Sequence, residues 1–243
     1  MSAVAKSDVG DLLGRLTAED LDRGERGRLL VALTRALTGA VRAAGARAAL
    51  SGRLLTDLLA DDVAPRLQVR DLLTLRSHHH GLSGDELAQA LIKNASMVTA
   101  AIGAASGAVA AVEVIAPPAL LAAPVQLVAE TLAVVAVELK LVAELHVVFG
   151  RAPSGTPAQR TVGYLTAWAG KRGLDAIGVV PSLSSVLSTA ARQQLRQRLV
   201  RRLGRNLSSL APFLAGAVAG AELNRRETRS LGEALRRDLR PRR

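Results

Sequence analysis

"AVELKLVAELHVVFG", Ala136–Gly150, has the composition of a buried helix, because it consists mostly of Val, Leu and Ala, yet it carries four ionisable side chains. A surface helix normally has a broad polar face and a narrower apolar one. This stretch has the opposite pattern and needs protein or lipid around most of its circumference. The directions of its charged side chains decide between an active site, an ion-paired core and a membrane-seated helix.

A helical projection places four polar residues of this region on one narrow seam. Successive residues turn by about 100°, so the four fall within an arc of about 80°. The residues of this polar seam are Gln126, Glu130, Lys140 and Glu144. Glu138 and His146 lie well off the seam, and His146 is interpreted as a packed or hydrogen-bonded core histidine.

The polar seam is expected to face a partner inside the protein, because an unpaired charge in a low-dielectric environment is costly. The chain is rich in arginine, so we expect arginines of a neighbouring helix to pair with Glu130 and Glu144. Lys140 and Glu144 can also pair directly at their i,i+4 spacing, although the lysine-first order is the less favourable one. The alternative is a seam that binds a ligand or performs catalysis.

The seam belongs to one arm of a predicted helical hairpin. Ser83 and Glu86 have the spacing of a capping box, which predicts a helix from Gly84. The first arm is expected over residues 85–115 and the second over 124–149, because the prolines between them interrupt a helix. Gly150 is expected to end the second arm as a C-cap.

The rest of the 243-residue chain is also expected to be helical. Apolar residues make up 49% and aromatic residues only 2%, and the abundant Ala and Leu favour helix. The fold class is therefore all-α, a multi-helix bundle around the apolar hairpin. Residues 1–77 are expected to form an N-terminal helical region and 78–243 the helical core, within one continuous domain. In the C-terminal part we expect a helix over 157–173, a short apolar segment over 210–221 and a separate basic helix after it.

Two features of the chain indicate close helix packing and an anionic partner. Two GxxxG motifs, Gly103 with Gly107 and Gly216 with Gly220, let helices approach closely, in a membrane or in an Ala-rich bundle. The net charge is +11, which favours nucleic acid or anionic lipid as a partner. An amphipathic helix over 183–203 carries the basic residues expected to bind an anionic surface. These are Arg192, Arg196, Arg198, Arg201, Arg202 and Arg205.

Several residues near and beyond the seam resemble one known family. "ETLAVVAVELKLVAELHVVFG", Glu130–Gly150, resembles the central signature of EcsC-family proteins. The matching positions are Glu130, Lys140, Glu144, Phe149 and Gly150, then Pro212, Gly216, Gly220, Asn224 and Thr228. Glu130, Lys140 and Phe149 stand where that pattern expects Asp, Arg and Tyr. The similarity covers roughly residues 65–235 and implies a helical, membrane-associated protein with no assigned reaction.

No catalytic, metal or cofactor site is expected from the sequence. There is no GxSxG, no P-loop and no GxGxxG motif, and the absence of cysteine excludes thiolate chemistry. The run His78–His80 invites a metal, but three consecutive side chains rarely converge on one ion, so they are interpreted as solvated loop histidines. We therefore expect a protein that is not an enzyme, with no cofactor and no identified small-molecule substrate.

The expected function is association with the cytoplasmic face of the membrane, with anionic lipids and a membrane protein as candidate partners. The apolar hairpin would lie at or re-enter the bilayer, and basic amphipathic helices would contact the headgroups. The absence of an apolar signal segment and of cysteine favours a cytoplasmic location. The first alternative is a soluble helical interaction or scaffold protein. Nucleic-acid binding is the weakest alternative, because the chain has few aromatic residues for base stacking.

Overall fold

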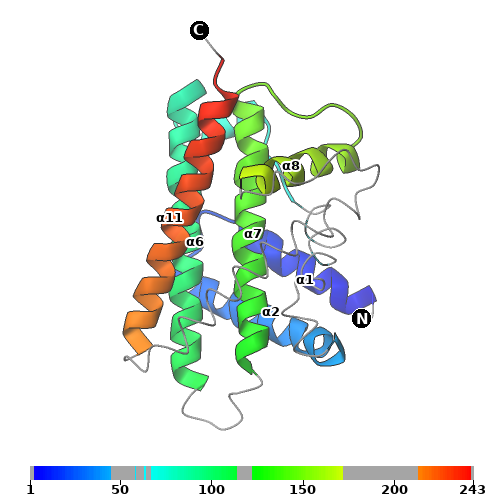
Figure 1. The fold of residues 1–243 in the computed structure, drawn as a ribbon, viewed down its shortest axis with the longest axis vertical. Coiled ribbons are helices and arrows are strands. Elements are labelled where there is room, and N and C mark those ends of the chain that lie inside the picture. Colours follow the sequence, from blue (N-terminus) through cyan, green and yellow to red (C-terminus); the bar gives the residue numbers. More distant parts are fainter. Residues whose placement is uncertain are drawn as a thin grey trace.

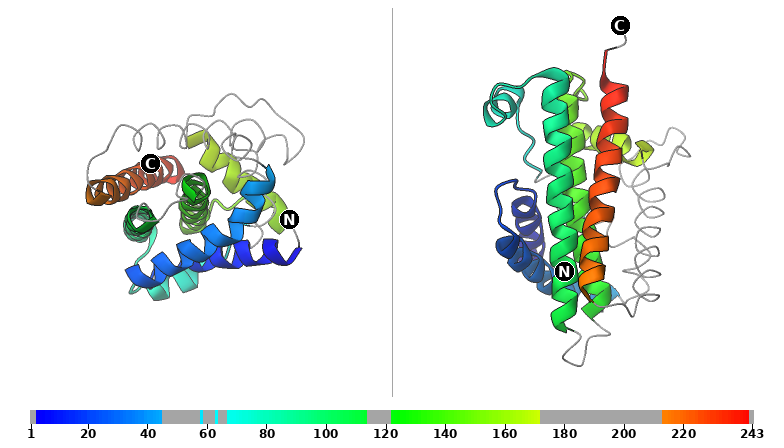
Figure 2. Two further views of the ribbon diagram at one scale, coloured as in Figure 1. Left: turned by 90° about the horizontal axis from the view of Figure 1, so that it is seen from below. Right: turned by 90° about the vertical axis from the view of Figure 1, so that its left-hand side faces the viewer.

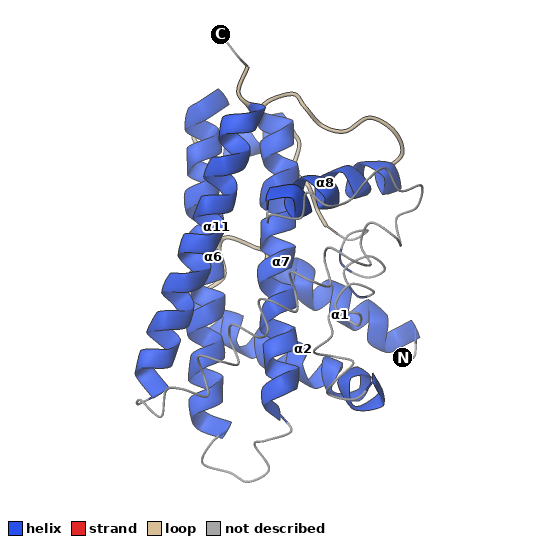
Figure 3. Ribbon diagram, viewed as in Figure 1, coloured by secondary structure: helices blue, strands red, loops and turns tan. Residues whose placement is uncertain are grey.

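The protein is all-α, as the sequence predicts, and the described residues form seven helices and no strand (Figures 1 and 3). A computed structural model describes residues 3–44, 58, 63, 67–113, 122–171 and 213–241. The helices are α1 (Ala3–Leu16), α2 (Arg23–Ala44), α5 (Leu72–His78), α6 (Gly84–Glu113), α7 (Ala122–Val148), α8 (Pro157–Lys171) and α11 (Phe213–Leu239). The predicted arginine helix over 183–203 lies outside the described residues.

Three long helices, α6, α7 and α11, stand side by side along the longest axis of the molecule (Figure 1). The predicted hairpin arms are α6 and α7. However, α6 packs more extensively against α11 than against its own hairpin partner. On the opposite side, α1 and α2 cross over α6 and α7, while α8 crosses α7 near its C-terminal end (Figure 2). The hairpin is thus covered by other helices of the same chain.

The contact between α6 and α11 depends on one glycine from each GxxxG motif. A Cβ atom on Gly103 would lie only 2.8 Å from the backbone carbon and oxygen of Gly220. The two backbones can therefore approach this closely only because Gly103 has no side chain. The other two glycines, Gly107 and Gly216, lie in the same two helices, at positions whose surroundings the structure does not describe.

The N-terminal helices share one hydrophobic core with the hairpin. The apolar side chains Leu29, Leu30, Leu33 and Leu37 of α2 are buried, and the last two are fully inaccessible to solvent. Arg26, also buried, donates hydrogen bonds to the carbonyl oxygens of Leu16 and Ala18 at 2.8 and 3.1 Å. It thereby satisfies backbone acceptors at the end of α1, which a helix terminus leaves without partners.

Helix ends in the core follow the sequence signals closely. α6 begins at Gly84, and α7 ends before Gly150, whose φ of +63° is the left-handed conformation that glycine adopts readily. The amide of Arg151 donates to His146 O at 2.8 Å, as in a Schellman cap. The second arm begins at Ala122, two residues before the prediction, because Pro124 is tolerated in a first helical turn.

The C-terminal part differs from the prediction in one respect. The apolar segment up to Ala221 and the basic segment after it form a single helix, α11, rather than two elements. The described residues after Gly220 present arginines to solvent on one side and bury Leu231 and Leu235 on the other.

Candidate functional site

The polar seam of α7 lies where the helical projection places it. Between Val125 and Val148 nearly every side chain of α7 is buried. Gln126, Glu130 and Lys140 are half-buried, and Glu144 is almost fully buried at 3% exposure. The helix is therefore apolar and enclosed on most sides, and the four seam residues follow one line along it.

Two seam residues are bonded by the neighbouring long helices. Gln126 donates a side-chain hydrogen bond to the carbonyl oxygen of Ser106 on α6. The amide of Asn224 on α11 donates to Glu130 Oε1 and to the carbonyl oxygen of Thr99, both at 3.2 Å. For Glu130 the sequence predicted an arginine partner, and the structure shows an amide donor. These bonds tie α7 to α6 and α11.

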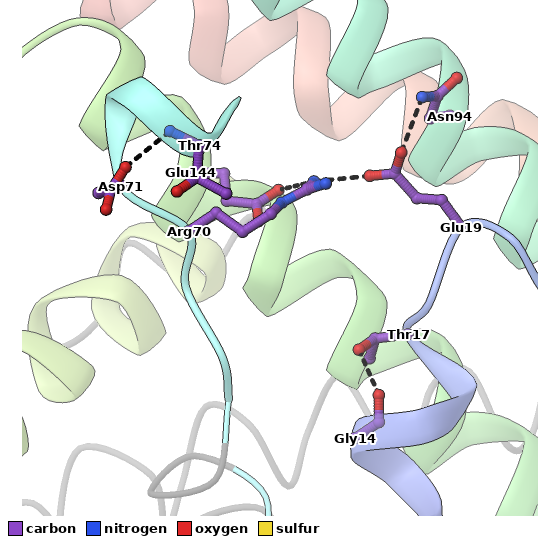
Figure 4. A network of polar contacts seen from close by, with 8 residues as sticks. All are labelled: Gly14, Thr17, Glu19, Arg70, Asp71, Thr74, Asn94 and Glu144. Carbon is purple, nitrogen blue, oxygen red and sulfur yellow. Dashed lines mark hydrogen bonds and ion pairs between the residues drawn. The ribbon is translucent and has the colours of Figure 1, made fainter. Parts of the chain in front are cut away.

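The most strongly bonded seam residue is Glu144, and its partner is an arginine, as predicted (Figure 4). Arg70 Nε and Nη2 donate to the two oxygens of Glu144 at 2.8 and 2.9 Å. Such a bidentate fork is the strongest form of a charged hydrogen bond. Contrary to the prediction, the arginine comes from the non-helical segment before α5 and not from a neighbouring helix. Hydrogen bonding to Glu144 raises the pKa of Arg70 above its ordinary value.

A second carboxylate completes this network. Arg70 Nη2 also donates to Glu19 Oε1 at 2.6 Å, and Asn94 donates to Glu19 Oε2 at 3.0 Å (Figure 4). We call Arg70, Glu144, Glu19 and Asn94 the Arg70 clasp. It joins four parts of the chain: the segment before α5, α7, the α1–α2 connection and α6.

The electrostatics of Glu19 show what the Arg70 clasp contributes. Burial by itself would raise the pKa of the Glu19 carboxyl group, but hydrogen bonds and charge from Arg70, with the bond from Asn94, bring that pKa below its ordinary value of 4.5. A carboxyl group with a depressed folded-state pKa stabilises the protein above its unfolded-state pKa. This stabilisation is lost as the pH falls through the folded-state value.

The prediction that Lys140 can pair with Glu144 is wrong. Both oxygens of Glu144 are taken by the fork of Arg70, and Lys140 forms no ion pair with any described carboxylate. Lys140 instead borders a small cleft of about 20 Å³ that Thr17, Glu19 and Glu144 also line. A space of this size accepts about one water molecule. The described cleft is therefore far smaller than the pockets of about 300–1,000 Å³ that hold small-molecule ligands.

Replacing Lys140 by methionine is consequently expected to change the free energy of unfolding by less than about 1 kcal/mol. The side chain keeps its length and loses no ion pair with a described residue. The matched control is Lys93→Met, at an exposed position on α6. Urea denaturation followed by circular dichroism measures both variants. A loss above about 2 kcal/mol for Lys140→Met alone would mean that its charge is paired inside the protein.

The residue that the helical projection left off the seam, Glu138, is fully buried at 0% exposure. It accepts hydrogen bonds from Trp168 Nε1 on α8 at 2.9 Å and from Thr228 Oγ1 on α11 at 3.2 Å. Glu138 thus connects α7 with α8 and with α11 through side-chain hydrogen bonds. The sequence held one signal for it, a carboxylate that the helical period places on the apolar side of the helix.

The four histidines are divided between core and surface. His146 is buried, donates from Nδ1 to Val142 O at 2.7 Å and packs edge-on against Tyr164, as predicted for a core histidine. Burial lowers its pKa. His78 and His80 are exposed, but His79 is buried, so the prediction of three solvated histidines is wrong for this residue. Among the described residues, no group of three His, Asp or Glu side chains is placed to hold a metal ion.

The six arginines predicted to bind an anionic surface lie outside the described residues, within 172–212. Three described arginines of α11, Arg225, Arg226 and Arg236, and Arg240 just after it have acidic partners, whereas Arg229 and Arg237 are exposed. Arg225 and Arg226 both donate to Glu222 and lower its pKa to about 2. Arg236 and Arg240 pair with Asp85 at the start of α6.

Apolar side chains are also exposed, and three of them are close in sequence. The described residues contain five exposed large hydrophobic side chains: Val69, Leu72, Leu73, Met97 and Val218. The first three fall within five residues, just before and at the start of α5, and Leu73 is 78% exposed. No sequence pattern distinguishes this stretch from other apolar parts of the chain. None of the helices, over the part of the chain that is described, has the length and apolar character needed to cross a membrane.

Comparisons with known proteins assign no family. No protein-family model, no curated protein and no solved structure matches the chain. The EcsC resemblance therefore rests on the quoted residues alone. Several of those residues have definite places in the structure. Glu130, Glu144, Asn224 and Thr228 form side-chain hydrogen bonds, Gly220 packs against Gly103, and Gly150 ends α7. The function has to be argued from these surfaces and contacts.

Proposed function

We propose that the chain is an EcsC-like, non-enzymatic helical protein that associates with the anionic, cytoplasmic face of a membrane. The observation that carries this proposal is the cluster of exposed apolar side chains Val69, Leu72 and Leu73, which we call the apolar corner. Single exposed hydrophobic residues are ordinary on protein surfaces, whereas a local group of them indicates an interaction site.

The apolar corner has the composition of a membrane-contacting element. It lies near one end of the long-helix bundle, on α5 and the segment before it (Figure 2). Arg76 and His78 follow on the same short helix and are exposed. Apolar side chains that enter the acyl boundary, with cationic groups at the headgroup level, bind anionic bilayers. The net charge of +11 adds long-range attraction.

The proposed membrane contact is the exposed apolar corner, and not the hairpin that the sequence predicts to contact the bilayer. The described part of α7 is enclosed by α1, α2, α6, α8 and α11 of the same chain. Its apolar side chains would have to leave protein contacts before they reached lipid. The apolar corner needs no such rearrangement, because its side chains are already exposed.

A second candidate function is a helical interaction protein that needs no membrane. The observation that favours it is the pairing of several arginines in and just after α11 with acidic side chains of the same chain. Arg225 and Arg226 are bound to Glu222, and Arg236 and Arg240 to Asp85. These cations are compensated within the chain, which weakens the attraction of this helix to a polyanion.

Flotation with phospholipid vesicles tests the proposal. We expect the protein to float with vesicles that contain phosphatidylglycerol, to bind phosphatidylcholine vesicles much less, and to be released in part by high salt. Leu73→Asp is expected to weaken binding by about tenfold or more, because one leucine side chain no longer enters the apolar phase.

The matched control is Val218→Asp, which makes a similar change at a side chain that is 70% exposed on α11. We expect this variant to bind like the unchanged protein. Failure of the unchanged protein to float with either vesicle would reject the membrane proposal and favour the interaction protein. An equal loss in both variants would mean that added negative charge, and not the apolar corner, controls binding.

A further inference from the structure

The apolar corner contains one side chain that points the other way. Val69 and Leu72 are exposed, but Arg70 between them turns inward, so that its side chain is only 16% exposed. Leu67, three residues earlier, also packs against the hydrophobic core. The described segment 67–70 is not helical. Its path over the surface is therefore set by these two inward contacts.

Arg70 is held by groups that have little freedom to move. Glu144 lies within the buried face of α7, and its two oxygens accept the fork of Arg70. The side chain of Glu144 is 3% exposed, so water cannot replace the guanidinium group without rearrangement of the packing. Glu19 and Asn94 bind on the other side of the fork. Breaking one side of a buried ion pair leaves the other charge buried without a partner, which strongly favours the clasped position.

The position of Arg70 also determines where α5 begins, because the helix starts directly after it in the chain. The next residue, Asp71, is the N-cap of this helix and accepts a hydrogen bond from the amide of Thr74 at 2.7 Å. Leu75, one turn further, is fully buried. Because successive helical residues turn by about 100°, Leu73 lies opposite the inward-facing Leu75 and is 78% exposed, while Leu72 lies at the edge of the buried side and is 38% exposed.

We infer that Glu144 is the positioning residue of the apolar corner: it holds Arg70 and so presents Val69, Leu72 and Leu73 as one exposed group. The inference rests on the proposed function for the meaning of that group, and on the Arg70 clasp for the position. It also explains why a buried acid on the central helix pairs with an arginine 74 residues away in the chain, on the segment that reaches the surface.

Hydrogen exchange tests the position without any membrane. The amides to follow are those of Leu75, His79 and Gly81, which donate to carbonyl oxygens of the N-cap residue Asp71 and of Leu75 and Arg76 within α5. In Glu144→Gln we expect their exchange to accelerate at least tenfold relative to the amides in the middle of α6 and α11. Arg70→Lys is the milder variant, which keeps the charge and loses the fork, and we expect a smaller acceleration at the same amides.

The matched control is Thr228→Val, which removes a buried hydroxyl group bonded to Glu138 on another side of α7. This variant should leave the amides around α5 unchanged relative to those of α6. A uniform acceleration of all helices in Glu144→Gln and in Arg70→Lys would overturn the inference, because the Arg70 clasp would then act only through global stability.

Vesicle flotation of the same variants separates this inference from the proposed function. We expect Glu144→Gln and Arg70→Lys to lose vesicle binding in the order of their hydrogen-exchange effects, although neither side chain belongs to the exposed group. Release of α5 together with unchanged vesicle binding would overturn the positioning role and leave the membrane proposal intact. If the unchanged protein binds no vesicle, the membrane proposal fails, and the exchange result alone decides whether Glu144 positions the corner.

Discussion

Replacing Trp168 by alanine is expected to lower the free energy of unfolding by about 3–5 kcal/mol. The indole ring is only 1% exposed, so its removal leaves a cavity between α7, α8 and α11. Glu138, which is completely buried, also loses the donor at 2.9 Å from its Oε2. For a chain of this size the melting temperature should fall by roughly 6–20 °C.

Circular dichroism during urea denaturation is the measurement for this variant, because Trp168 is the only tryptophan and the variant lacks its fluorescence. Trp168→Phe provides the comparison, since it keeps most of the ring volume and removes only the N–H donor. We expect it to cost about half as much as the alanine variant, or less. Equal stabilities of the alanine variant and the unchanged protein would contradict a core position for this ring.

Replacing Gly103 by leucine is expected to destabilise the protein by about 3 kcal/mol or more. Even a Cβ atom at this position would lie 2.8 Å from the backbone of Gly220 and 2.7 Å from Asn224 Nδ2. The backbone of α11 cannot give way like a flexible side chain, so α6 and α11 must separate. That separation also disturbs the bonds from Asn224 to Thr99 and Glu130.

The control for this variant is Gly39→Leu on α2, where an added Cβ atom meets nothing within 4 Å. We expect this change to stabilise the protein by about 0.5–1 kcal/mol, because leucine favours helix more than glycine does. Thermal unfolding of both variants gives the comparison. Similar melting temperatures for the two leucine variants would show that Gly103 does not set the distance between α6 and α11.

Much of the local structure follows from residues that are close in the chain. The positive φ of Gly150 and the start of α6 at Gly84 agree with the local cap signals. The burial of α7 on most sides agrees with its helical period, and so does the half-exposure of Gln126, Glu130 and Lys140. These features were predictable because each depends on the conformation of one helix and its two ends.

The partners of the polar residues were not predictable in the same way. Glu144 binds Arg70 rather than Lys140, which is four residues away, because only a guanidinium fork satisfies both of its oxygens. Glu138 is off the polar seam, yet its burial is complete, because α8 and α11 bring Trp168 and Thr228 to it. The helical period predicts the direction in which a side chain points. It does not predict which residue of another helix or segment lies in that direction.

The same distinction applies to the surface that we propose as the working part of the molecule. The segment 67–73 reads as one more apolar and basic stretch among several. Its exposure becomes visible only when Arg70 and Leu75 are seen to be anchored inward.

By itself, the sequence determined the helical class, the two arms of the hairpin, the caps at Gly84 and Gly150, and the phase of α7. These depend on backbone propensity and on the period of apolar residues, which act over a few turns. Only the tertiary structure decided that α11 packs closely on α6 through Gly103 and Gly220, and that Glu144 binds Arg70. Those contacts join residues far apart in the chain, and the packing of whole helices selects them from many pairs of similar chemistry.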